Sequence, residues 1–464
     1  MGIQVYNTLT NKKEPFTPIK AGKVSMYLCG PTVYDNGHLG HGRSAVAFDI
    51  IRRYLEYTYG NENVTFVTNY TDIDDKMIKR AKKEGITVKE LAERIIPEYT
   101  KDYAALGVKP STIQTLATEY VDEMIDIVKI LVEKEFAYEL DDGVYFEVEK
   151  FKEYGKLSNQ NRDELRAGAR IEKDDKKRHP HDFVLWKKEK PGEPSWDSPW
   201  GKGRPGWHIE CSAMSQATLG QPFDIHGGGQ DLTFPHHECE IAQSEAAYET
   251  QFCNIWLHNG FITVDEEKMS KSLGNFFTLK DIFKKYDPQA VRYFFLTAQY
   301  RSPIEFTETQ LTQASSSLER IKDFLINVKN NDAKPTEKHN ELNNKCKQLI
   351  TAFESSMNDD FDTPAALAAL FTFIKHINPE LREGILSKED SSQIMKTLQK
   401  VDTVLNILPA IDASIDQDVE KLIAERKQAR EEGNWKRSDK IREELANKGI
   451  ALEDTAQGTI WKKV

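Results

Sequence analysis

The sequence has no apolar run long enough to cross a membrane. Its most apolar stretch, residues 365–374 (AALAALFTFI), covers ten residues, about half of the roughly 20 that a bilayer requires. The first sixteen residues also lack the apolar core of about 7–15 residues that marks a secretory signal. These two absences exclude a membrane span and predict a protein that is not exported.

Cysteine is scarce as well. The five cysteines are too few and too scattered along 464 residues for a disulfide framework, and their odd number leaves at least one unpaired. We therefore expect a protein of the reducing cytoplasm.

The chain has no surplus of positive charge, because 63 Lys and Arg residues face 74 Asp and Glu residues, for a net charge of -11. This balance gives no general attraction to nucleic acid, although it does not say where individual charges lie. The composition is otherwise that of a globular protein, since 39% hydrophobic and 10% aromatic residues provide for buried cores. At about 150 residues per domain, the length predicts about three domains.

The first seventy residues follow the pattern strand, loop, helix, strand. Residues 24–29 (VSMYLC) alternate loosely between apolar and polar, and a loop of Gly, Pro, Asp and Asn follows. Residues 40–59 carry apolar side chains at helical spacing, and residues 64–69 (VTFVTN) are typical of a second strand. This β-α-β unit predicts an α/β protein with a parallel sheet of the nucleotide-binding class.

Later segments differ in composition. Residues 121–190 combine a helical stretch, a hairpin-like stretch and charged loops, which suits an insertion in the sheet domain. Residues 191–207 hold four Pro, four Gly and three of the seven Trp, which excludes a helix or a central strand. We expect this aromatic loop to cover a pocket rather than to serve as a surface linker. Residues 306–419 have a helical pattern and predict a bundle.

Two histidines flank the predicted start of the first helix. His38 and His41 lie where backbone N–H groups are unpaired and the helix dipole is positive, a position that attracts phosphate. The alternative is that they only cap the helix. Further along, Lys268 and Lys271 lie in a Ser- and Gly-rich loop and offer mobile cations to a polyphosphate, with a solvated surface turn as the alternative.

A group of Cys, His and Glu residues in the second half of the chain suggests a metal site. Pro235 can open a helix, after which His236 and Glu240, four residues apart, project from the same face. That spacing suits two ligands of one metal. A pairing of His236 with Cys239, or one that uses His237, is equally compatible with the spacing, and an amphipathic helix with surface histidines is the structural alternative.

The sequences HLGH (38–41) and KMSKS (268–272), in this order and on either side of an insertion, resemble the paired HIGH and KMSKS motifs of class I aminoacyl-tRNA synthetases. The resemblance implies a Rossmann-type sheet that binds ATP with Mg²⁺, and an amino-acid carboxylate that attacks the α-phosphorus. It implies four catalytic residues, which are His38, His41, Lys268 and Lys271. The implied ATP-binding residues are His38, Gly40, His41, Lys268, Ser270 and Lys271.

Four further segments narrow the resemblance to one family of that class, the cysteinyl-tRNA synthetases: MYLCG (26–30), TDIDDK (71–76), GWHIECSAM (206–214) and DIHGGGQDLTFPHHECEIAQS (224–244). In that family one zinc ion per chain has ligands that match Cys29, Cys211, His236 and Glu240. The residues expected to wall the amino-acid pocket are Thr71, Trp207 and His226, with ordinary core packing as the alternative. Cys239 stands where the family commonly has Asn, which leaves open whether a further thiol lies near the metal.

Zinc would explain how such an enzyme selects cysteine. A thiolate is a strong soft ligand for Zn²⁺, whereas a serine hydroxyl stays protonated and binds poorly. An apolar pocket discriminates between substrates that differ by one atom by only about 1–3 kcal/mol. Coordination of the substrate sulfur to zinc would discriminate more strongly, so a separate editing site would be unnecessary. Residues 121–202 are accordingly too short and too charged for a hydrolytic editing domain.

The C-terminal region suggests contacts with RNA. Residues 421–464 carry eleven Lys or Arg against eight Asp or Glu, and include a helical stretch at 434–448 and two short strand-like pieces at 450–452 and 459–461. A solvated charged face is the alternative. Residues 287–296 resemble the start of a DALR-type helical region, or form an ordinary buried helix. The chain's end resembles the family's anticodon domain, and the matching positions are Arg430, Asp439, Asp454 and Trp461.

The sequence therefore predicts an α/β protein: a Rossmann-type parallel-sheet catalytic domain with an insertion, then an α-helical bundle and a small C-terminal α+β anticodon-binding domain. The expected activity is ATP-dependent ligation of L-cysteine to its tRNA through cysteinyl-adenylate, by a cytoplasmic monomer. Alternatives are a ligase that joins cysteine to an amino sugar and a non-catalytic RNA-binding protein. The expected segments are 1–120 with 203–275 (catalytic), 121–202 (insertion), 276–312 (stem contact), 313–410 (bundle) and 411–464 (anticodon binding).

Overall fold

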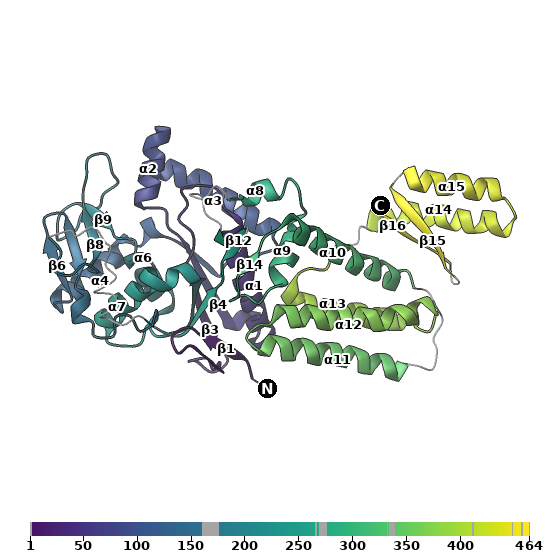
Figure 1. Cartoon of the computed structure of the whole chain (residues 1–464), viewed down its shortest axis with the longest axis horizontal. Coiled ribbons are helices and arrows are strands. Elements are labelled where there is room, and N and C mark those ends of the chain that lie inside the picture. Colours follow the sequence, from purple (N-terminus) through teal and green to yellow (C-terminus); the bar gives the residue numbers. More distant parts are fainter. Residues whose placement is uncertain are drawn as a thin grey trace. The chain divides into compact units, whose positions relative to one another are not determined.

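The structure, a computed structural model, describes residues 2–159, 176–264, 267–268, 276–331, 333, 339–410, 413–447, 449–455 and 458–463. The chain forms two compact units, Met1–Thr307 with Met357–Asp362, and Glu308–Ser356 with Thr363–Val464 (Figure 1). Among the described residues, every helix is too short or too polar to span a membrane.

A five-stranded parallel sheet forms the centre of the first unit, in the order β11-β10-β3-β4-β5. The strands are mostly buried and rich in β-branched and aromatic residues, as expected when helices cover both faces. They span β3 Val24–Leu28, β4 Val64–Tyr70, β5 Ile113–Leu116, β10 Phe223–Gly229 and β11 Cys253–Asn259. The predicted α/β fold is confirmed, and the two strands predicted near the N-terminus are β3 and β4.

Helices pack on this sheet in two groups. α1 (Leu39–Tyr59) contacts four of the strands, and α2 (Asp75–Glu84) and α3 (Val88–Ala105) follow β4. α6 (Ile209–Leu219) contacts β4 and packs with α4 and α7 into a second layer (Figure 1). The bounds of these last two helices are α4 Val121–Glu133 and α7 Glu238–Tyr248.

The order of the strands determines where a ligand can bind. From β3 the chain continues through α1 to β4 on one side, whereas the strand on the other side of β3 is β10, which comes much later in the sequence. Loops that leave neighbouring strands in opposite directions open a crevice at the carboxyl ends of those strands. The crevice of this sheet lies beyond the ends of β3 and β10.

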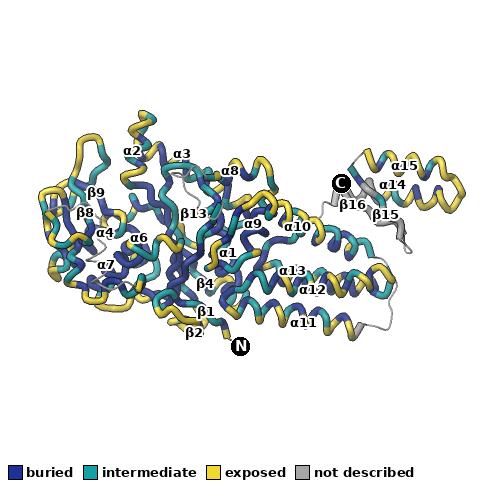
Figure 2. The backbone as a smooth tube through the Cα atoms, viewed as in Figure 1, coloured by how far each residue is buried: buried dark blue, intermediate teal, exposed yellow. Residues whose placement is uncertain are grey.

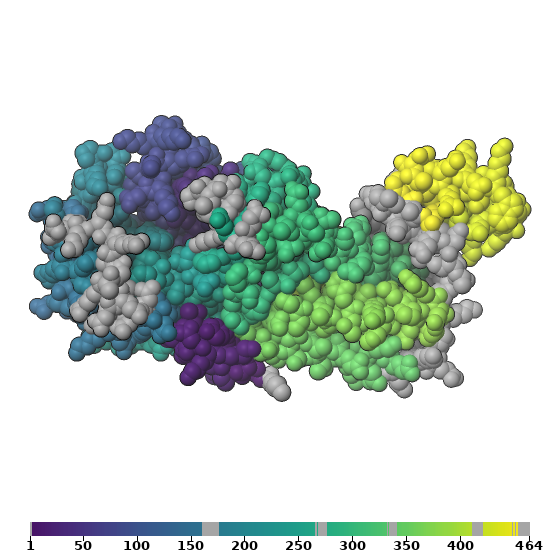
Figure 3. All heavy atoms as spheres, in the orientation of Figure 1, coloured from purple at the N-terminus to yellow at the C-terminus, as the bar shows by residue number. Residues whose placement is uncertain are grey.

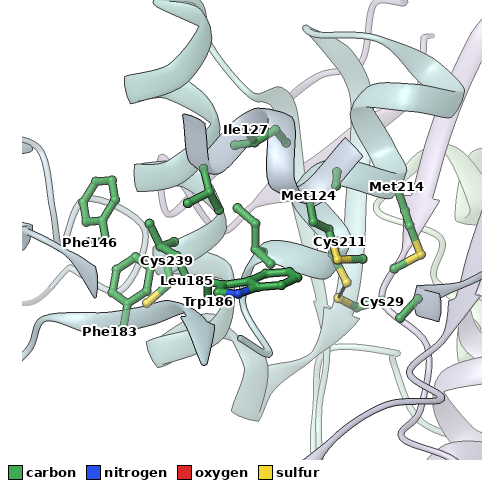
Figure 4. Close-up of a cluster of buried hydrophobic side chains, with 14 of the residues drawn as sticks. Cys29, Met124, Ile127, Phe146, Phe183, Leu185, Trp186, Cys211, Met214 and Cys239 are labelled. Carbon is green, nitrogen blue, oxygen red and sulfur yellow. Dashed lines mark hydrogen bonds between the residues drawn. The ribbon is translucent and has the colours of Figure 1, made fainter. Parts of the chain in front are cut away.

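The insertion carries a four-stranded antiparallel sheet in the order β6-β7-β8-β9, so the predicted hairpin is its first two strands. Aromatic side chains of this sheet, Phe146, Phe183 and Trp186, belong to the same buried cluster as Met124 of α4 and Cys211 of α6 (Figure 4). The insertion therefore shares a core with the helices beside the central sheet. The strands span β6 Ala137–Leu140, β7 Gly143–Phe146, β8 Phe183–Lys188 and β9 Gly203–Pro205.

The three tryptophans of the 191–207 segment have separate roles. Trp200 is buried, Trp196 packs against the core, and Trp207 alone of the three lines the cavity described below. The segment contributes only the short strand β9, at the edge of its sheet, which agrees with the predicted absence of a helix or central strand.

Short elements complete the first unit. α9 follows the predicted phosphate loop, and its Arg292 is fully buried and bonds to Asp49 of α1 at 2.7 Å. This buried ion pair connects α9 to the helix that begins with the two histidines. The elements are β1 Gln4–Asn7, β2 Lys12–Pro15, β12 Ile262–Val264, β13 Glu267–Lys268, α8 Leu279–Ile282, α9 Pro288–Leu296 and β14 Ile304–Glu305.

The second unit is mainly helical, as predicted. α10 (Glu308–Lys329), α12 (Thr363–Arg382) and α13 (Lys388–Leu405) pack together, and α11 (His339–Asn358) precedes α12. The C-terminal part has two helices and a hairpin with a small core of Ile441, Leu445 and Ile450. Its elements are α14 Ala413–Glu431, α15 Trp435–Asn447, β15 Ile450–Thr455 and β16 Gly458–Lys463, with both strands longer than predicted.

Candidate active site

The carboxyl ends of β3, β4, β10 and β11 surround a cavity of about 840 Å³. It lies at the crevice that the strand order creates. Side chains from the predicted metal, histidine and amino-acid sites meet here, although some of them, such as Cys29 and His236, are 207 positions apart in sequence. Its lining includes Cys29, His38, His41, Thr71, Trp207 and His236.

The loop after β3 is held tightly against the end of β4. The backbone N–H of Gly30 donates to Asn69 Oδ1 at 2.8 Å, and Thr71 N donates to Pro31 O at 3.1 Å. A Cβ atom on Gly30 would lie only 1.6 Å from the carbonyl oxygen of Asn69, so this approach requires glycine. The contact brings Cys29 and Thr71 to the same end of the cavity.

Four ligand-type side chains meet at that end: Cys29, Cys211, His236 and Glu240. The two sulfur atoms are 3.1 Å apart, and both cysteines are free thiols. Cys29 Sγ lies 3.4 Å from His236 Nε2 and 3.5 Å from Glu240 Oε1, and those two atoms are 3.0 Å apart. Tetrahedral zinc, with bonds of about 2.0–2.3 Å, places its ligand atoms about 3.3–3.8 Å apart. Two of the four distances fall in this range and the other two are shorter, so the four side chains are gathered closely enough to hold one ion and would move apart slightly around zinc.

Two further histidines orient the ligands. His208 Nδ1 lies 2.9 Å from His236 Nδ1, and His226 Nε2 lies 2.7 Å from Glu240 Oε2. His236 and Glu240 thus each direct one ring nitrogen or carboxylate oxygen toward the thiols, and the other atom lies at hydrogen-bond distance from a neighbouring imidazole. Contacts of this kind fix the orientation of metal ligands.

A second group shares Cys29 and Glu240 but replaces the other two ligands with His226 and His237. It is less suited to zinc, because it has one thiol instead of two and because His226 and Glu240 are already at hydrogen-bond distance. Neither histidine is among the residues that line the cavity, so a metal there would not face a substrate.

The structure places the Cys239 thiol outside the group formed by Cys29, Cys211, His236 and Glu240. Cys239 Sγ lies 3.4 Å from Tyr154 OH, and the residue belongs to neither group of ligand-type side chains. Burial raises the pKa of this thiol. Phe234, with an extended backbone (φ -141°, ψ 135°), is the one non-helical residue in the stretch Thr233–His237. The chain therefore turns helical at Pro235, as predicted, and continues into α7. The predicted proximity of His236 and Glu240 is present as well.

Electrostatics in the cluster favour a cation. Burial opposes ionisation of Cys211, but the hydrogen bond from Cys29 and the neighbouring His236 outweigh it and bring its pKa to about 6. Despite its burial, Glu240 has a pKa well below its usual range because of His226 and His236. Glu240 in turn overcomes burial and raises the pKa of His236 to about 10. The His236 proton is thus held by the Glu240 carboxylate and the Cys211 thiolate, and a metal ion bound at the same ring nitrogen would take the place of that proton.

His38 and His41 cap α1 and also line the cavity. His38 Nδ1 accepts from the backbone N–H of His41, and His41 Nδ1 accepts from that of His38, both at 3.3 Å. The rings stack with centroids 3.6 Å apart. The first turn of α1 holds no acidic side chain that would neutralise the positive end of the helix dipole. Both predicted roles, capping and phosphate binding, are therefore compatible with the geometry.

The predicted phosphate loop is described only in part. Ser270 and Lys271 lie outside the described residues, and only the backbone of Lys268 is described, in β13. Their predicted roles stay predictions.

Of the three residues predicted to wall the amino-acid pocket, two line the cavity. These are Thr71 and Trp207, and the Trp207 ring stacks on His236 with centroids 4.2 Å apart. His226 is not among the residues that line the cavity: it is fully buried behind Glu240 and stacks on Trp256 at 4.4 Å. Its place on a central strand turns its side chain into the core.

Sequence reasoning missed three residues that contact the site. His208 and Glu210 lie beside Cys211 in the GWHIEC segment, where their proximity was the available signal; Glu210 Oε2 accepts from Thr71 Oγ1 at 2.7 Å. Tyr99 OH lies 3.1 Å from His41 Nδ1. No local signal marks Tyr99, because it reaches the site through the packing of α3.

The predicted RNA-contacting residues lie in the C-terminal part of the second unit. Arg430 of α14 and Asp439 of α15 are exposed. Asp454 pairs with Thr459 and Trp461 with Leu452 in the β15–β16 register, whereas the side chains of Asp454 and Trp461 are outside the description. Trp435, which the sequence did not single out, is 59% exposed, and the Arg430 guanidinium lies 6.0 Å from its ring centre.

Comparison with protein families matches most of the chain. A model described as the class I (C) catalytic domain of tRNA synthetases matches residues 15–316. The DALR domain matches residues 352–409, and the cysteinyl-tRNA ligase anticodon binding domain matches residues 412–461.

Curated relatives and solved structures agree with these matches. The chain is 49% identical to the cysteine–tRNA ligase of Geobacter metallireducens and 48% identical to that of Carboxydothermus hydrogenoformans, each over 100% of both chains. A methionyl-tRNA synthetase of Mycobacterium tuberculosis with methionyl-adenylate has a TM-score of 0.60 at 14% identity, covering 83% of this chain and 90% of that one. A leucyl enzyme of Agrobacterium radiobacter in a complex with tRNA has a TM-score of 0.63 at 11% identity, covering 85% of each. At these identities the solved structures show a common fold.

Proposed function

The chain belongs to the cysteine–tRNA ligase family of class I aminoacyl-tRNA synthetases, and on that premise we propose how its residues charge tRNA with cysteine. The observation that carries the proposal is the cluster of Cys29, Cys211, His236 and Glu240 at the end of the cavity that His38 and His41 also line. It supports a single site that binds both ATP and cysteine. The match of the anticodon-binding model at 412–461 favours tRNA over an amino sugar as acceptor.

In the first step, the cysteine carboxylate attacks the α-phosphorus of ATP and pyrophosphate leaves. Because His38 Nδ1 and His41 Nδ1 accept backbone hydrogens, each neutral ring carries its proton on Nε2. Both rings would donate from Nε2 to phosphate oxygens as charge develops on the leaving group. Gly40, Lys268, Ser270 and Lys271 complete the proposed phosphate site, and Mg²⁺ would accompany ATP.

In the second step, a ribose hydroxyl of the tRNA terminus attacks the adenylate carbonyl and AMP leaves. The chain needs no covalent nucleophile for either step, because positioning and charge stabilisation supply the catalysis. Thr71 and Trp207 are the proposed walls of the amino-acid pocket. We propose that His226 acts instead by holding Glu240 in its orientation.

The donor set of the cluster, with two thiols, one imidazole and one carboxylate, fits Zn²⁺, and we propose one zinc ion held by Cys29, Cys211, His236 and Glu240. When bound, it supplies a soft Lewis acid that a substrate thiolate can coordinate and a serine hydroxyl cannot. Cys29, Cys211 and His236 line the cavity, which gives a substrate side chain access to this group.

The proposal is tested by cysteine-dependent ATP–pyrophosphate exchange. We expect the exchange rate with serine to be lower than the rate with cysteine by at least about 10³-fold. Coordination of the sulfur to zinc would add to the discrimination that an apolar pocket provides. Removal of the metal with a chelator should lower exchange in proportion to the zinc content, and added zinc should restore it. Equal use of serine, or a metal-free protein with full activity, would contradict the zinc site.

For tRNA recognition, we propose that Arg430, Asp439, Asp454 and Trp461 contact anticodon bases. The exposed Trp435 beside Arg430 offers an additional flat surface for a base. The segment boundaries predicted from the sequence are kept as proposals, supported by the family models that match 352–409 and 412–461. We also propose that the enzyme is monomeric and cytoplasmic.

Replacing Asp439 with Ala is expected to raise the KM for tRNA about tenfold, because loss of one base-edge contact costs about 1–3 kcal/mol. Cysteine-dependent pyrophosphate exchange should stay unchanged, since Asp439 lies in the second unit. Glu431→Ala, which removes an exposed carboxylate from α14, is the matched control and should charge tRNA normally. Equal loss of charging and exchange in the Asp439 variant would count against an anticodon role.

A further inference from the structure

Helix α2 carries a stripe of lysines on its exposed face. In its sequence DKMIKRAKKE, Lys76, Lys79 and Lys83 are three and four residues apart, so they lie on one face. Met77 and Ala81, the buried residues of the helix, lie on the opposite face. All three lysines are exposed, and Figure 2 shows α2 with exposed residues along its outer side.

The acidic residues near the stripe have other partners. Asp75 pairs with Lys187 and Arg204 of the insertion, and Glu84 pairs with Arg80 and Arg94. Asp35 pairs with Arg80 at 3.8 Å, and Asp74 caps α2 by accepting from the backbone N–H groups of Lys76 and Met77. Within the described part of the chain, no carboxylate lies at ion-pair distance from the three stripe lysines. No ion pair with a described residue therefore neutralises their positive charge, in a protein whose net charge is -11.

The stripe begins at the cavity and leads away from it. Lys76 lines the cavity, and its Nζ lies 5.6 Å from the centre of the Tyr34 ring. Because an α-helix rises about 1.5 Å per residue, Lys83 lies about 10 Å further along the helix than Lys76. In Figure 3 the α2 segment forms part of the outer surface, at the top of the view. The charge thus extends from the mouth of the cavity onto the surface.

We propose that this stripe binds the phosphate backbone of the acceptor arm of tRNA, where its end enters the cavity. The inference rests on the proposed function, which requires the terminal ribose to reach the adenylate. A polyanion whose end lies in the cavity has its adjoining phosphates at the cavity mouth, where Lys76 begins the stripe. Lysines bind phosphate as point charges without reading bases, so the contact is independent of sequence.

The experiment compares two neighbouring lysines. Successive residues of a helix point about 100° apart, so Lys83→Gln and Lys82→Gln remove the same charge from adjacent exposed positions, one on the stripe and one on its flank. We expect Lys83→Gln to raise the KM for tRNA several-fold and Lys82→Gln to have little effect. The double variant Lys79→Gln/Lys83→Gln should raise it roughly tenfold.

Salt dependence gives a second readout. Removing one lysine–phosphate interaction should reduce the slope of log affinity against log salt concentration by about 0.7–0.9, measured by binding of tRNA transcripts at increasing salt. Cysteine-dependent pyrophosphate exchange should stay at the wild-type rate in all three variants. An unchanged KM and slope in the double variant, or an equal rise in the KM for tRNA in Lys82→Gln and Lys83→Gln, would contradict binding of tRNA by the stripe. Failure of the proposed function would appear differently, as absence of exchange in the wild-type protein.

Discussion

Replacing Cys211 with Ser is expected to remove the bound zinc and to lower cysteine-dependent pyrophosphate exchange by at least about 100-fold. A serine hydroxyl stays protonated at neutral pH and is a poor zinc ligand. The side chain lies 3.1 Å from Cys29 Sγ inside a fully buried group, so no solvent-exposed residue can take its place. Zinc content by plasma mass spectrometry and the exchange rate, measured on the same preparation, would check the prediction.

Cys239→Ser provides a matched control, because it is the same substitution at another buried cysteine of the same core. Its thiol contacts Tyr154 OH and lies outside the ligand group, so the variant should retain zinc and exchange activity. Thermal unfolding of both variants separates loss of metal from loss of the fold. If Cys239→Ser lost as much zinc as Cys211→Ser, the assignment of the ligands would be wrong.

His38→Asn is expected to lower the rate of pyrophosphate exchange about 10²–10³-fold while leaving the melting temperature unchanged. Asn is among the best N-cap residues, so it can replace His38 in capping α1. It cannot reproduce the imidazole N–H that we propose for the phosphates, and loss of one donor to a developing charge typically costs that factor. Steady-state exchange and thermal unfolding together would check the prediction.

His38→Ala should lose the same catalytic factor and also the cap. Loss of an N-cap costs about 1 kcal/mol in the free energy of unfolding. The difference in the free energy of unfolding between the Ala and Asn variants therefore measures the contribution of His38 to capping. The loss of exchange activity that both variants share measures its contribution to catalysis. A His38→Asn enzyme with nearly wild-type exchange would show that His38 serves only to cap the helix.

The sequence predicted the central elements because their patterns are local. The alternation in β3 and β4 and the helical spacing in α1 result from residues that are neighbours in the chain. The proximity of His236 and Glu240 was likewise predictable, since four residues make about one helical turn. The helical start at Pro235 was predictable too, because proline suits the first turn of a helix, and the extended backbone of Phe234 marks the break before it.

His226 illustrates the limit of such reasoning. Resemblance to a family predicted that it walls the amino-acid pocket, whereas the structure places its ring against Glu240. Which neighbour its ring contacts depends on the side to which β10 turns it, and there Glu240 and Trp256 enclose it. The same applies to Tyr99, because only the packing of α3 brings it to the site. It also applies to the lysine stripe on α2, because only the ion pairs of the described residues show which lysines have no carboxylate partner among them.

The sequence by itself determined the family, the α/β fold, the identity of four candidate metal ligands and the two histidines at the start of α1. The fold and the helix start follow from local patterns, whereas the family and the ligand set follow from motifs that resemble those of the family. The tertiary structure decided that Cys29 and Cys211, 182 positions apart, place their sulfurs 3.1 Å from each other, that Cys239 faces Tyr154, and that His226 supports Glu240. Such contacts depend on how strands and helices distant in sequence pack together, and packing is set by the whole fold rather than by any single segment.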